Sequence, residues 1–536
     1  MTTGAGGVGG AGGTGLGGGL RAVSGAGPAR AADPAALSGG AAGADALRPL
    51  LDTVLAALAA GAAHRGGPVP PGEPPALAAL VAAELRRADG AEALDRLTEL
   101  LAYGSADPAD PACAAHLHCP PLAVAVAADL AVSALNPSQD SWDQAPAATA
   151  LETALLAELA GLVGFDPQRA SGVLTSGGTE SNLMGLMLAR DQLLPGIVEL
   201  DGLEAAGSQP RIFASRAAHF SVQRAAALLG LGERAVVPVP VDAELRMDPD
   251  ALAAALAGAV WEGATPLAVV ATAGTTDTGA VDPLHRAADL AARYGAWLHV
   301  DAAYGGGALL SDRLAPLLAG IARADSVSLD WHKLGWQPAA AGVFLVRRAE
   351  TYLSLARRAA YLNPVDDEEA GYPSLLGLSL RTTRRADAFK IAVTLRTLGR
   401  AGLGRLVDRC HELALATAES VRAQPRLELY CEPVLTTVVF RYLPAGEAAG
   451  QGGAGAADPA AADRLNAELR RLLLREGRAV VGRTELPGEG SGRVRLKLTL
   501  LNPHATAADT ARVLGEVVRA GAELESAARR PDAGSS

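Results

Sequence analysis

From about residue 170 onward, short apolar runs alternate with amphipathic segments, and this alternation restricts the fold more than any other feature of the chain. The apolar runs have the length of buried strands, and the segments between them have the length and polarity of helices. Strands joined by helical crossovers form a mainly parallel sheet with helices on both faces. The predicted strands are SGVLT (171–175), RIFAS (211–215), AVVPVPV (235–241), LAVVATA (267–273), AWLHV (296–300), SVSL (326–329) and GVFLV (342–346).

The regions on either side of this alternation have different patterns. ALRPLLDTVLAALAA and LETALLAELAGLVGF carry apolar residues at helical spacing, whereas LELYCEPVLTTVVFRYL and RVRLKLTLLNP indicate strands. ATAADTARVLGEVVRAG predicts a closing helix, and AGEAAGQGGAGAADP a surface loop. We therefore predict a Gly/Ala-rich disordered tail (1–45), a helical segment (46–165), a large α/β domain (166–395), a smaller α+β domain (396–525) and a second disordered tail (526–536).

Polar side chains follow five of the predicted strands, at the edge where a doubly wound sheet binds ligands. A Gly-rich turn, SGGTE, leads into a helix whose first turn offers free backbone N–H groups to an anion. The other strand ends supply His219, Thr276, Asp301 and the segment DWHK, which contains Lys333. Each residue has a structural alternative: His219 can be a hydrogen-bonded, half-buried histidine, and Asp301 can cap a helix.

Lys333 is notable because lysine is rare in this chain. Lysine and arginine together number 47, and only Lys333, Lys390 and Lys497 are lysines. A lysine can lose its proton and attack a carbonyl, whereas a guanidinium stays charged. The alternative is that a lysine remains at an exposed surface position by chance. For Lys390 we expect a role in packing or in an ion pair.

Charge and cysteine content exclude several classes of function. The formal net charge is −11 and basic runs are absent from the sequence, which argues against nucleic-acid and anionic-membrane partners. The four cysteines, Cys113, Cys119, Cys410 and Cys431, have neither metal-site nor CxxC spacing, so we predict no metal site. Reduced thiols and an N-terminus without signal-peptide features indicate a cytoplasmic protein.

The polar groups at the sheet edge match the needs of pyridoxal 5'-phosphate. Lysine binds its aldehyde, a buried carboxylate holds the proton of its ring nitrogen, and a helix N-terminus binds its phosphate. Lys333, Asp301 and the SGGTE turn supply these three groups.

The motifs TSGGTESNL, HFSVQRAAALLG, GTTDTGAVDP, HVDAAYGG and DWHKLGWQP together resemble those of the pyridoxal-phosphate amino-acid decarboxylases related to glutamate, aromatic amino-acid and 2,4-diaminobutyrate decarboxylases. The resemblance covers roughly residues 50 to 525 and implies the α/β fold of fold-type I enzymes and a homodimer with active sites at the interface. It also implies covalent binding of the cofactor by Lys333 and pairing of Asp301 with the ring nitrogen. The remaining cofactor contacts implied are His219 and Ala303 on the two ring faces, Gly178, Thr179 and His332 at the phosphate, and Thr276 beside the cofactor.

The resemblance extends to a mobile catalytic loop within AAYLNPVDDEEAGYPSLLGLSLRTTRRAD. It implies that Tyr361 donates a proton to Cα and that Thr383 lies near the phosphate of the partner subunit. It places Lys497 where glutamate decarboxylases carry a carboxylate-binding arginine. One departure is DWHK in place of the frequent NPHK, which puts Asp330 near an anionic phosphate.

AHLHCPPL and ALNPSQDSWDQA are most similar to diaminobutyrate decarboxylases and to the related lysine or ornithine enzymes. Asp140 and Asp143 can bind the distal ammonium of such a substrate, or else cap the loop. The sequence therefore predicts decarboxylation of L-2,4-diaminobutyrate, with lysine or ornithine as alternative substrates. An aminotransferase of the same fold and a catalytically silent binding protein are the competing hypotheses.

Overall fold

The computed structural model describes residues 35–87, 90–194, 197–203, 209–356, 362–445, 458–485 and 490–529. Most of both predicted tails, and most of the predicted loop 445–459, lie outside these residues. The chain divides into two compact units, one from Met1–His64 and Pro74–Tyr103 and the other from Arg65–Glu73 and Gly104–Ser536. The described part of the first unit is helical and consists mainly of α1 (Gly43–Arg65), α2 (Pro74–Arg87) and α3 (Ala93–Gly104).

Within the first unit the helices pack closely. A Cβ atom at Gly61 of α1 would lie 2.3 Å from the backbone oxygen of Glu99 in α3, so glycine allows the two helices to approach. Arg96 Nε of α3 lies 2.7 Å from Glu84 Oε1 of α2, in an ion pair whose carboxylate is buried. By length and apolar composition alone α1 could cross a membrane, and so could α5 (Pro146–Val163) of the second unit. In α5, however, Leu155, Leu159 and Val163 belong to the core.

The second unit contains the predicted sheet, with seven strands in the order β1-β7-β6-β5-β4-β2-β3. Six strands run parallel, and β7 runs antiparallel to its neighbours β1 and β6. The predicted fold class, a mainly parallel doubly wound α/β sheet, is therefore confirmed, and each predicted apolar run forms a strand. The strands are β1 (Ser171–Thr175), β2 (Pro210–Ser215), β3 (Val236–Val239), β4 (Thr265–Thr272), β5 (Trp297–Ala302), β6 (Ser326–Asp330) and β7 (Gly342–Val346).

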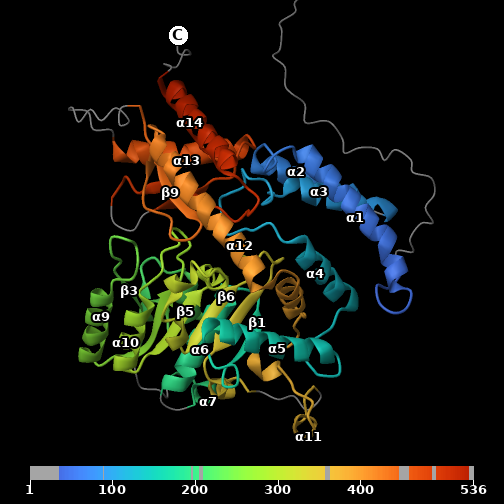
Figure 1. Ribbon diagram of the computed structural model, residues 1–536, viewed down its shortest axis with the longest axis vertical. Helices are drawn as coiled ribbons and strands as arrows, with labels where there is room; N and C mark the ends of the chain where they lie inside the picture. The colour runs from blue at the N-terminus through green and yellow to red at the C-terminus, as the bar shows by residue number, and fades with distance from the viewer. Residues whose placement is uncertain are drawn as a thin grey trace, which may run out of the picture. The chain divides into compact units, whose positions relative to one another are not determined.

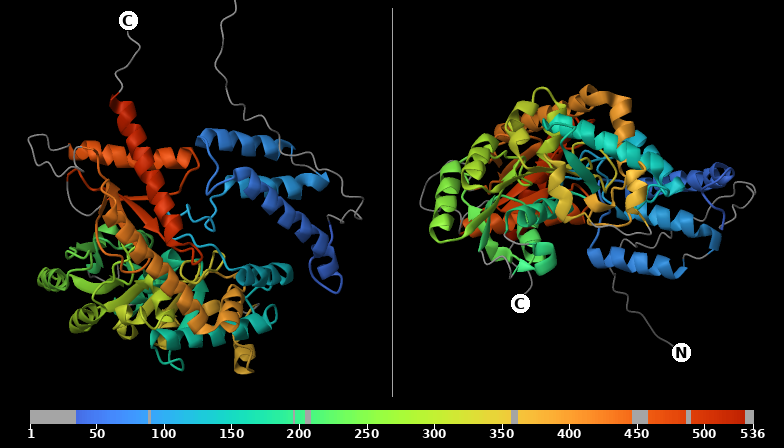
Figure 2. Two further views of the ribbon diagram at one scale, coloured as in Figure 1. Left: turned by 45° about the horizontal axis from the view of Figure 1, so that its top comes forward. Right: turned by 90° about the horizontal axis from the view of Figure 1, so that it is seen from below.

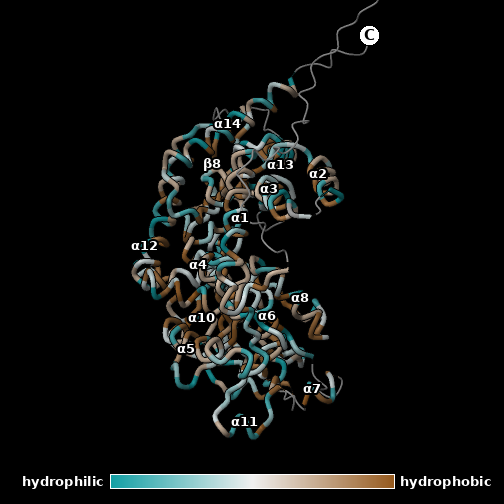
Figure 3. The backbone as a smooth tube through the Cα atoms, turned by 90° about the vertical axis from the view of Figure 1, so that its right-hand side faces the viewer, coloured by the Kyte–Doolittle hydropathy of each residue, from teal (hydrophilic) through white to brown (hydrophobic). Residues whose placement is uncertain are grey.

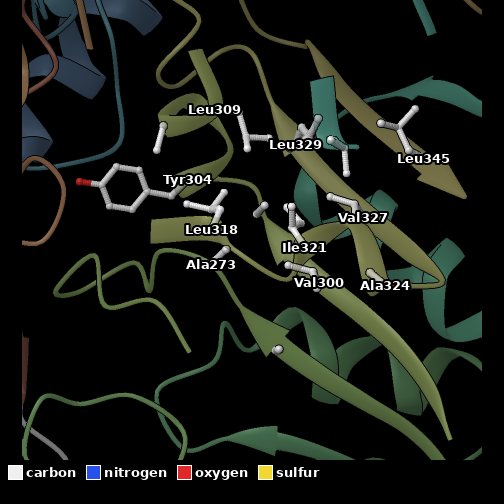
Figure 4. Close-up of a cluster of buried hydrophobic side chains, with 14 of the residues drawn as sticks. Ala273, Val300, Tyr304, Leu309, Leu318, Ile321, Ala324, Val327, Leu329 and Leu345 are labelled. Atoms are coloured by element: carbon white, nitrogen blue, oxygen red, sulfur yellow. The ribbon is translucent and has the colours of Figure 1, made fainter. Parts of the chain in front are cut away.

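Helices cover both faces of the sheet (Figure 1). Since successive side chains of a strand point to opposite faces, β5 and β6 each contribute to two environments. Val300, Val327 and Leu329 pack on one face with the short helices η4 (Gly305–Leu310), η5 (Ala315–Leu318) and η6 (Ile321–Arg323), as Figure 4 shows. That face also carries α5, α9 (Pro249–Trp261) and α10 (Leu284–Tyr294), while the other face carries α6 (Gly178–Leu193) and α8 (Ser221–Leu228).

A second, antiparallel sheet forms the C-terminal part of this unit, in the order β10-β11-β9-β8. Its strands are β8 (Leu427–Leu429), β9 (Thr437–Tyr442), β10 (Gly482–Glu485) and β11 (Val494–Thr499). The helices α13 (Pro459–Arg475) and α14 (Ala507–Arg529) pack on it and on each other (Figure 2). The sequence predicted β8, β9, β11 and α14, but not β10 or α13.

The long helix α12 (Ala388–Ala423) packs against both sheets' helices and connects the two parts. It changes direction at Gly399, where φ is 67°, and the predicted boundary at residue 395 falls inside it. The remaining helices are α4 (Ala123–Leu135), α7 (Val198–Asp201) and α11 (Val365–Glu369); α11 is one of the most hydrophilic segments in Figure 3. The short 3-10 helices include η4 (Gly305–Leu310), η5 (Ala315–Leu318), η6 (Ile321–Arg323) and η7 (Ala349–Ser354).

Candidate active site

The carboxyl ends of β1, β4, β5 and β6 meet at one edge of the large sheet and surround a cavity of about 440 Å³. Eight of the residues predicted for the site line this cavity. They are Gly178, Thr179, His219, Thr276, Asp301, Ala303, His332 and Lys333. Leu117, Ser176, Gly177, Thr272, Gly274, Tyr304 and Asp330 complete the lining.

One end of the cavity is shaped to receive an anion at the N-terminus of α6. Gly177 has φ 152°, which side chains disfavour, and a Cβ there would lie 3.2 Å from His332 Cε1. At Gly178 a Cβ would lie 2.9 Å from Ala303 Cβ and fill the space. His332 Nδ1 accepts a hydrogen bond from the Ala341 N–H, so its Nε2 carries the proton. The glycines and this N–H donor suit a phosphate group.

Alternation along the strands places a polar stripe on the face that α6 covers. Asp301 at the end of β5 is 6% exposed and has three hydrogen-bond donors within reach. They are Asn182 Nδ2 of α6 (2.8 Å), the Ala303 N–H (3.1 Å) and the Ser328 hydroxyl, whose single proton is shared between Asp301 Oδ1 (3.2 Å) and Asn182 Oδ1 (3.1 Å). The stripe consists of Trp297, His299, Asp301, Ser326, Ser328, Asp330 and Thr272.

Asn182 is the centre of this buried network. Its amide nitrogen also donates to Ser221 Oγ, so its oxygen faces His299 Nε2 at 2.9 Å. Burial lowers the pKa of His299 to about 4, although the Asp301 carboxylate opposes this shift. The neutral ring therefore donates from Nε2 to Asn182 and accepts the Ser326 hydroxyl at Nδ1. These hydrogen bonds fix the orientation of the amide that holds Asp301.

The same network orients His219, the imidazole proposed to stack on a cofactor ring. Its Nδ1 lies 2.8 Å from Ser221 Oγ and accepts the Ser221 N–H. Because Ser221 Oγ already accepts from Asn182, its hydroxyl proton points to His219 Nδ1. Burial lowers the pKa of His219, while the Asp301 carboxylate raises it. A neutral ring is suited to stacking on an aromatic cation.

Two buried polar atoms of the cavity wall lack a hydrogen-bond partner among the residues that the structure describes. They are Thr272 Oγ1 and Asp330 Oδ1. Buried polar atoms in folded proteins are nearly always paired, so these two indicate a missing polar ligand. Lys333 Nζ lies 2.9 Å from Asp330 Oδ2 and so faces the cavity next to the anion end. The residues present therefore fit pyridoxal phosphate.

Four other predicted site residues are described but do not line the cavity. Lys497 lies close to it, because its ammonium donates to the backbone oxygen of the cavity residue Thr276 at 3.3 Å. Asp143 is exposed and accepts a hydrogen bond from the Ser141 hydroxyl, as in the loop-capping alternative. Thr383 is exposed, and Asp140 is half-buried. Tyr361 lies outside the described residues.

Three residues of the site, Asn182, His299 and Thr272, were not predicted from the sequence. Asn182 lies in the quoted motif TSGGTESNL, four residues after Gly178 and hence on the same side of α6. The period-two patterns WLHVD and SVSLD contained a usable signal, since both strands alternate apolar and polar residues within a buried sheet. Polar residues on one face of a central strand need hydrogen-bond partners, and α6 supplies one in Asn182.

Comparisons with known proteins agree with this chemistry. The pyridoxal-dependent decarboxylase conserved domain matches residues 80–443. The L-2,4-diaminobutyrate decarboxylase of Rhizobium meliloti is 44% identical over 421 residues, 78% of this chain and 80% of that protein. The Acinetobacter baumannii enzyme of the same name is 38% identical over 80% of this chain and 83% of that protein.

Solved structures share the fold. The glutamate decarboxylase domain of the Vibrio parahaemolyticus diaminobutyrate-pyruvate transaminase and L-2,4-diaminobutyrate decarboxylase is 34% identical, with a TM-score of 0.79 over 91% of this chain and 98% of that chain. Oryza sativa TDC with PLP and tryptamine is 27% identical, with a TM-score of 0.79 over 90% and 98%. The match to the conserved domain, and identities of 44% and 38% over at least 80% of two relatives, place this chain in the pyridoxal-dependent decarboxylase family.

Proposed function

We propose that this chain converts L-2,4-diaminobutyrate to 1,3-diaminopropane and carbon dioxide. The observation that carries the decarboxylase chemistry is the cavity in which Lys333 and the hydrogen-bonded Asp301 lie at one sheet edge. The choice of substrate is supported by the two diaminobutyrate decarboxylases that are 44% and 38% identical to this chain. Lysine and ornithine are the alternative substrates.

Pyridoxal phosphate supplies an electron sink for the pair of electrons left on Cα when carbon dioxide departs. Lys333 would bind its aldehyde, and the first turn of α6 with the His332 N–H would hold its phosphate. Asp301 would keep the ring nitrogen protonated, because three hydrogen-bond donors hold this carboxylate in place. His219 would stack on the ring. Tyr361 is the proposed proton donor to Cα.

Lys497 would orient the substrate's α-carboxylate. Lys497 Nζ lies 2.7 Å from Asp277 Oδ1. The Asp277 side chain is 55% exposed, so a substrate carboxylate can compete with it for the ammonium at modest cost. The side chain of Lys497 itself is 8% exposed, which strengthens its attraction for an anion.

Asp140 is a better candidate than Asp143 for the distal ammonium. Asp140 Oδ1 is buried and has no hydrogen-bond partner within the described ranges; the same is true of Ser138 Oγ and both amide atoms of Gln139. A run of unpaired buried polar atoms calls for an additional partner. Because Asp140 does not line its own chain's cavity, we propose that it serves the cavity of a second copy in a homodimer.

A cytoplasmic location is proposed on the basis of the cysteines. All four are free thiols, and burial raises the pKa of Cys113, Cys119 and Cys410 to about 12. Such thiols are poorly reactive. They suit a reducing compartment, in which disulfides are rare.

The test is a kinetic comparison of amino acids with the holoenzyme, in which carbon dioxide and amine are measured together. Diaminobutyrate should give the highest kcat/KM among diaminobutyrate, ornithine, lysine, glutamate and tryptophan. Asp140→Asn should raise KM for diaminobutyrate by about 10- to 100-fold, as expected for loss of a partly buried charged partner. Asp143→Asn is the matched control and should change KM little. Preference for glutamate or tryptophan would contradict the diamino-acid proposal.

A further inference from the structure

The carboxylate of Asp330 lies at the anion end of the cavity, where a phosphate would be repelled. Its side chain is 2% exposed, with Oδ2 at 2.9 Å from Lys333 Nζ. Its other oxygen, Oδ1, has no hydrogen-bond partner in the described part of the chain. A Cβ at Gly178 would lie 3.4 Å from Oδ2, so this carboxyl group abuts the first turn of α6.

The charges around Asp330 come from few side chains. His332 Nε2 lies 3.6 Å from Asp330 Oδ2, and His219 and Asp301 also line the cavity. Burial lowers the pKa of both histidines, which leaves Lys333 as the one cationic residue among the described cavity-lining side chains. When Lys333 is protonated, its positive charge balances the negative charge of the Asp330 carboxylate. A phosphate dianion beside it would be favourable only if the cavity lost that negative charge.

Binding of the cofactor's aldehyde would form a C=N bond to Nζ of Lys333, and the aldehyde oxygen would leave as water. The attack uses the neutral amine of Lys333, so the ammonium must first lose a proton. We propose that Asp330 accepts this proton and then, as a neutral carboxylic acid, donates a hydrogen bond to the phosphate. One proton leaves Lys333 Nζ and is gained by Asp330 Oδ2, so the total charge of the pair does not change. After this transfer the carboxyl group of Asp330 can donate a hydrogen bond to the phosphate, whereas its carboxylate form would repel the phosphate.

This role differs from catalysis of decarboxylation. It concerns how the chain receives its cofactor and does not depend on which amino acid is the substrate. Since the proton passes within the pair, wild-type apoenzyme would bind pyridoxal phosphate without releasing the Lys333 proton to solvent. The side chain of Asp330→Asn cannot accept it, so the bound variant holds one proton fewer than the bound wild type.

The experiment counts protons exchanged with the buffer as pyridoxal phosphate binds to apoenzyme. Calorimetric titrations in buffers of different ionisation enthalpy give this number for the wild type, Asp330→Asn and Asp330→Ser. Both variants should release about one more proton per site than the wild type, by the proton linkage that relates binding to pH. An equal count in the wild type and either variant would overturn the proposal.

Asp277→Asn is the matched control, because Asp277 also pairs with a lysine at 2.7 Å but lies outside the cavity lining. Its proton count should equal that of the wild type. The pH dependence of the cofactor's Kd gives a second readout. A binding step that releases a proton is favoured as pH rises, so the affinity of Asp330→Asn relative to wild type should rise about tenfold per pH unit. A ratio independent of pH would contradict the transfer.

Discussion

All three lysines of the chain place their ammonium groups beside aspartates. Lys333 pairs with Asp330, and Lys497 pairs with Asp277. Lys390 is fully buried, with Nζ at 3.1 Å from Asp129 Oδ1 and 3.0 Å from Asp387 Oδ1. Of the two roles expected for Lys390, packing or an ion pair, the ion pair is present. A compact ammonium on a flexible stem fits such sites, whereas a planar guanidinium requires a wider space.

Asn182 is expected to position the carboxylate that pairs with the cofactor ring. Asn182→Ala removes its hydrogen bonds to Asp301 and Ser221 at once. Losing a hydrogen bond to a charged group costs about 1.5–3 kcal/mol, so the cofactor's Kd should rise by roughly 10- to 100-fold. The absorbance of bound cofactor as a function of pH should also shift, because the ring nitrogen loses a fixed partner.

Asn466→Ala is the control for this prediction. Asn466 is also 1% exposed and hydrogen-bonded, through Tyr442 and Ala462, but it lies in the C-terminal part. Both variants should lower the melting temperature, and only Asn182→Ala should change the Kd and the pH profile. If both variants bind cofactor like the wild type, Asn182 has a structural role alone.

At the scale of elements, α4 and α12 are joined through a partly buried ion cluster, of which Lys390 is the fully buried member. Asp129 of α4 lies beside Lys390 of α12, and Arg385 also pairs with Asp129 and Asp387. Lys390→Met should lower the free energy of unfolding by about 3 kcal/mol, near the low end for breaking a buried pair, because Arg385 still compensates the two aspartates. Urea unfolding measures this loss.

Lys497→Met serves as the comparison for Lys390→Met. Because Asp277 is largely exposed, that change should cost only about 1 kcal/mol of stability. Equal losses in the two variants would show that the α4–α12 cluster adds little to stability.

Strands were more predictable than the hydrogen bonds between layers. SGVLT and GVFLV are apolar runs bounded by turns, so period and length sufficed to identify them. The short β10, GRTE, has neither apolar length nor strong alternation, and it forms because β11 pairs with it. The local sequence does not specify which strand a segment will pair with.

At the scale of the whole molecule, the sequence placed the cavity because ends of parallel strands meet at one edge. It located Lys333, Asp301 and His219 there, since each follows an apolar run. It did not predict that Asn182 joins Asp301 to His219, because that link depends on the packing of α6 on the sheet. The proposed role of Asp140 likewise depends on a second copy, which one chain's pattern does not specify.

The measurement that tests the central claim most directly is borohydride reduction of the holoenzyme, followed by peptide mapping. Reduction fixes the cofactor permanently to the lysine that holds it. The cofactor's mass should be found on the peptide that contains Lys333, because this lysine alone among the three lines the cavity with Asp301. Label on Lys390 or Lys497 instead would contradict the assignment of the active site.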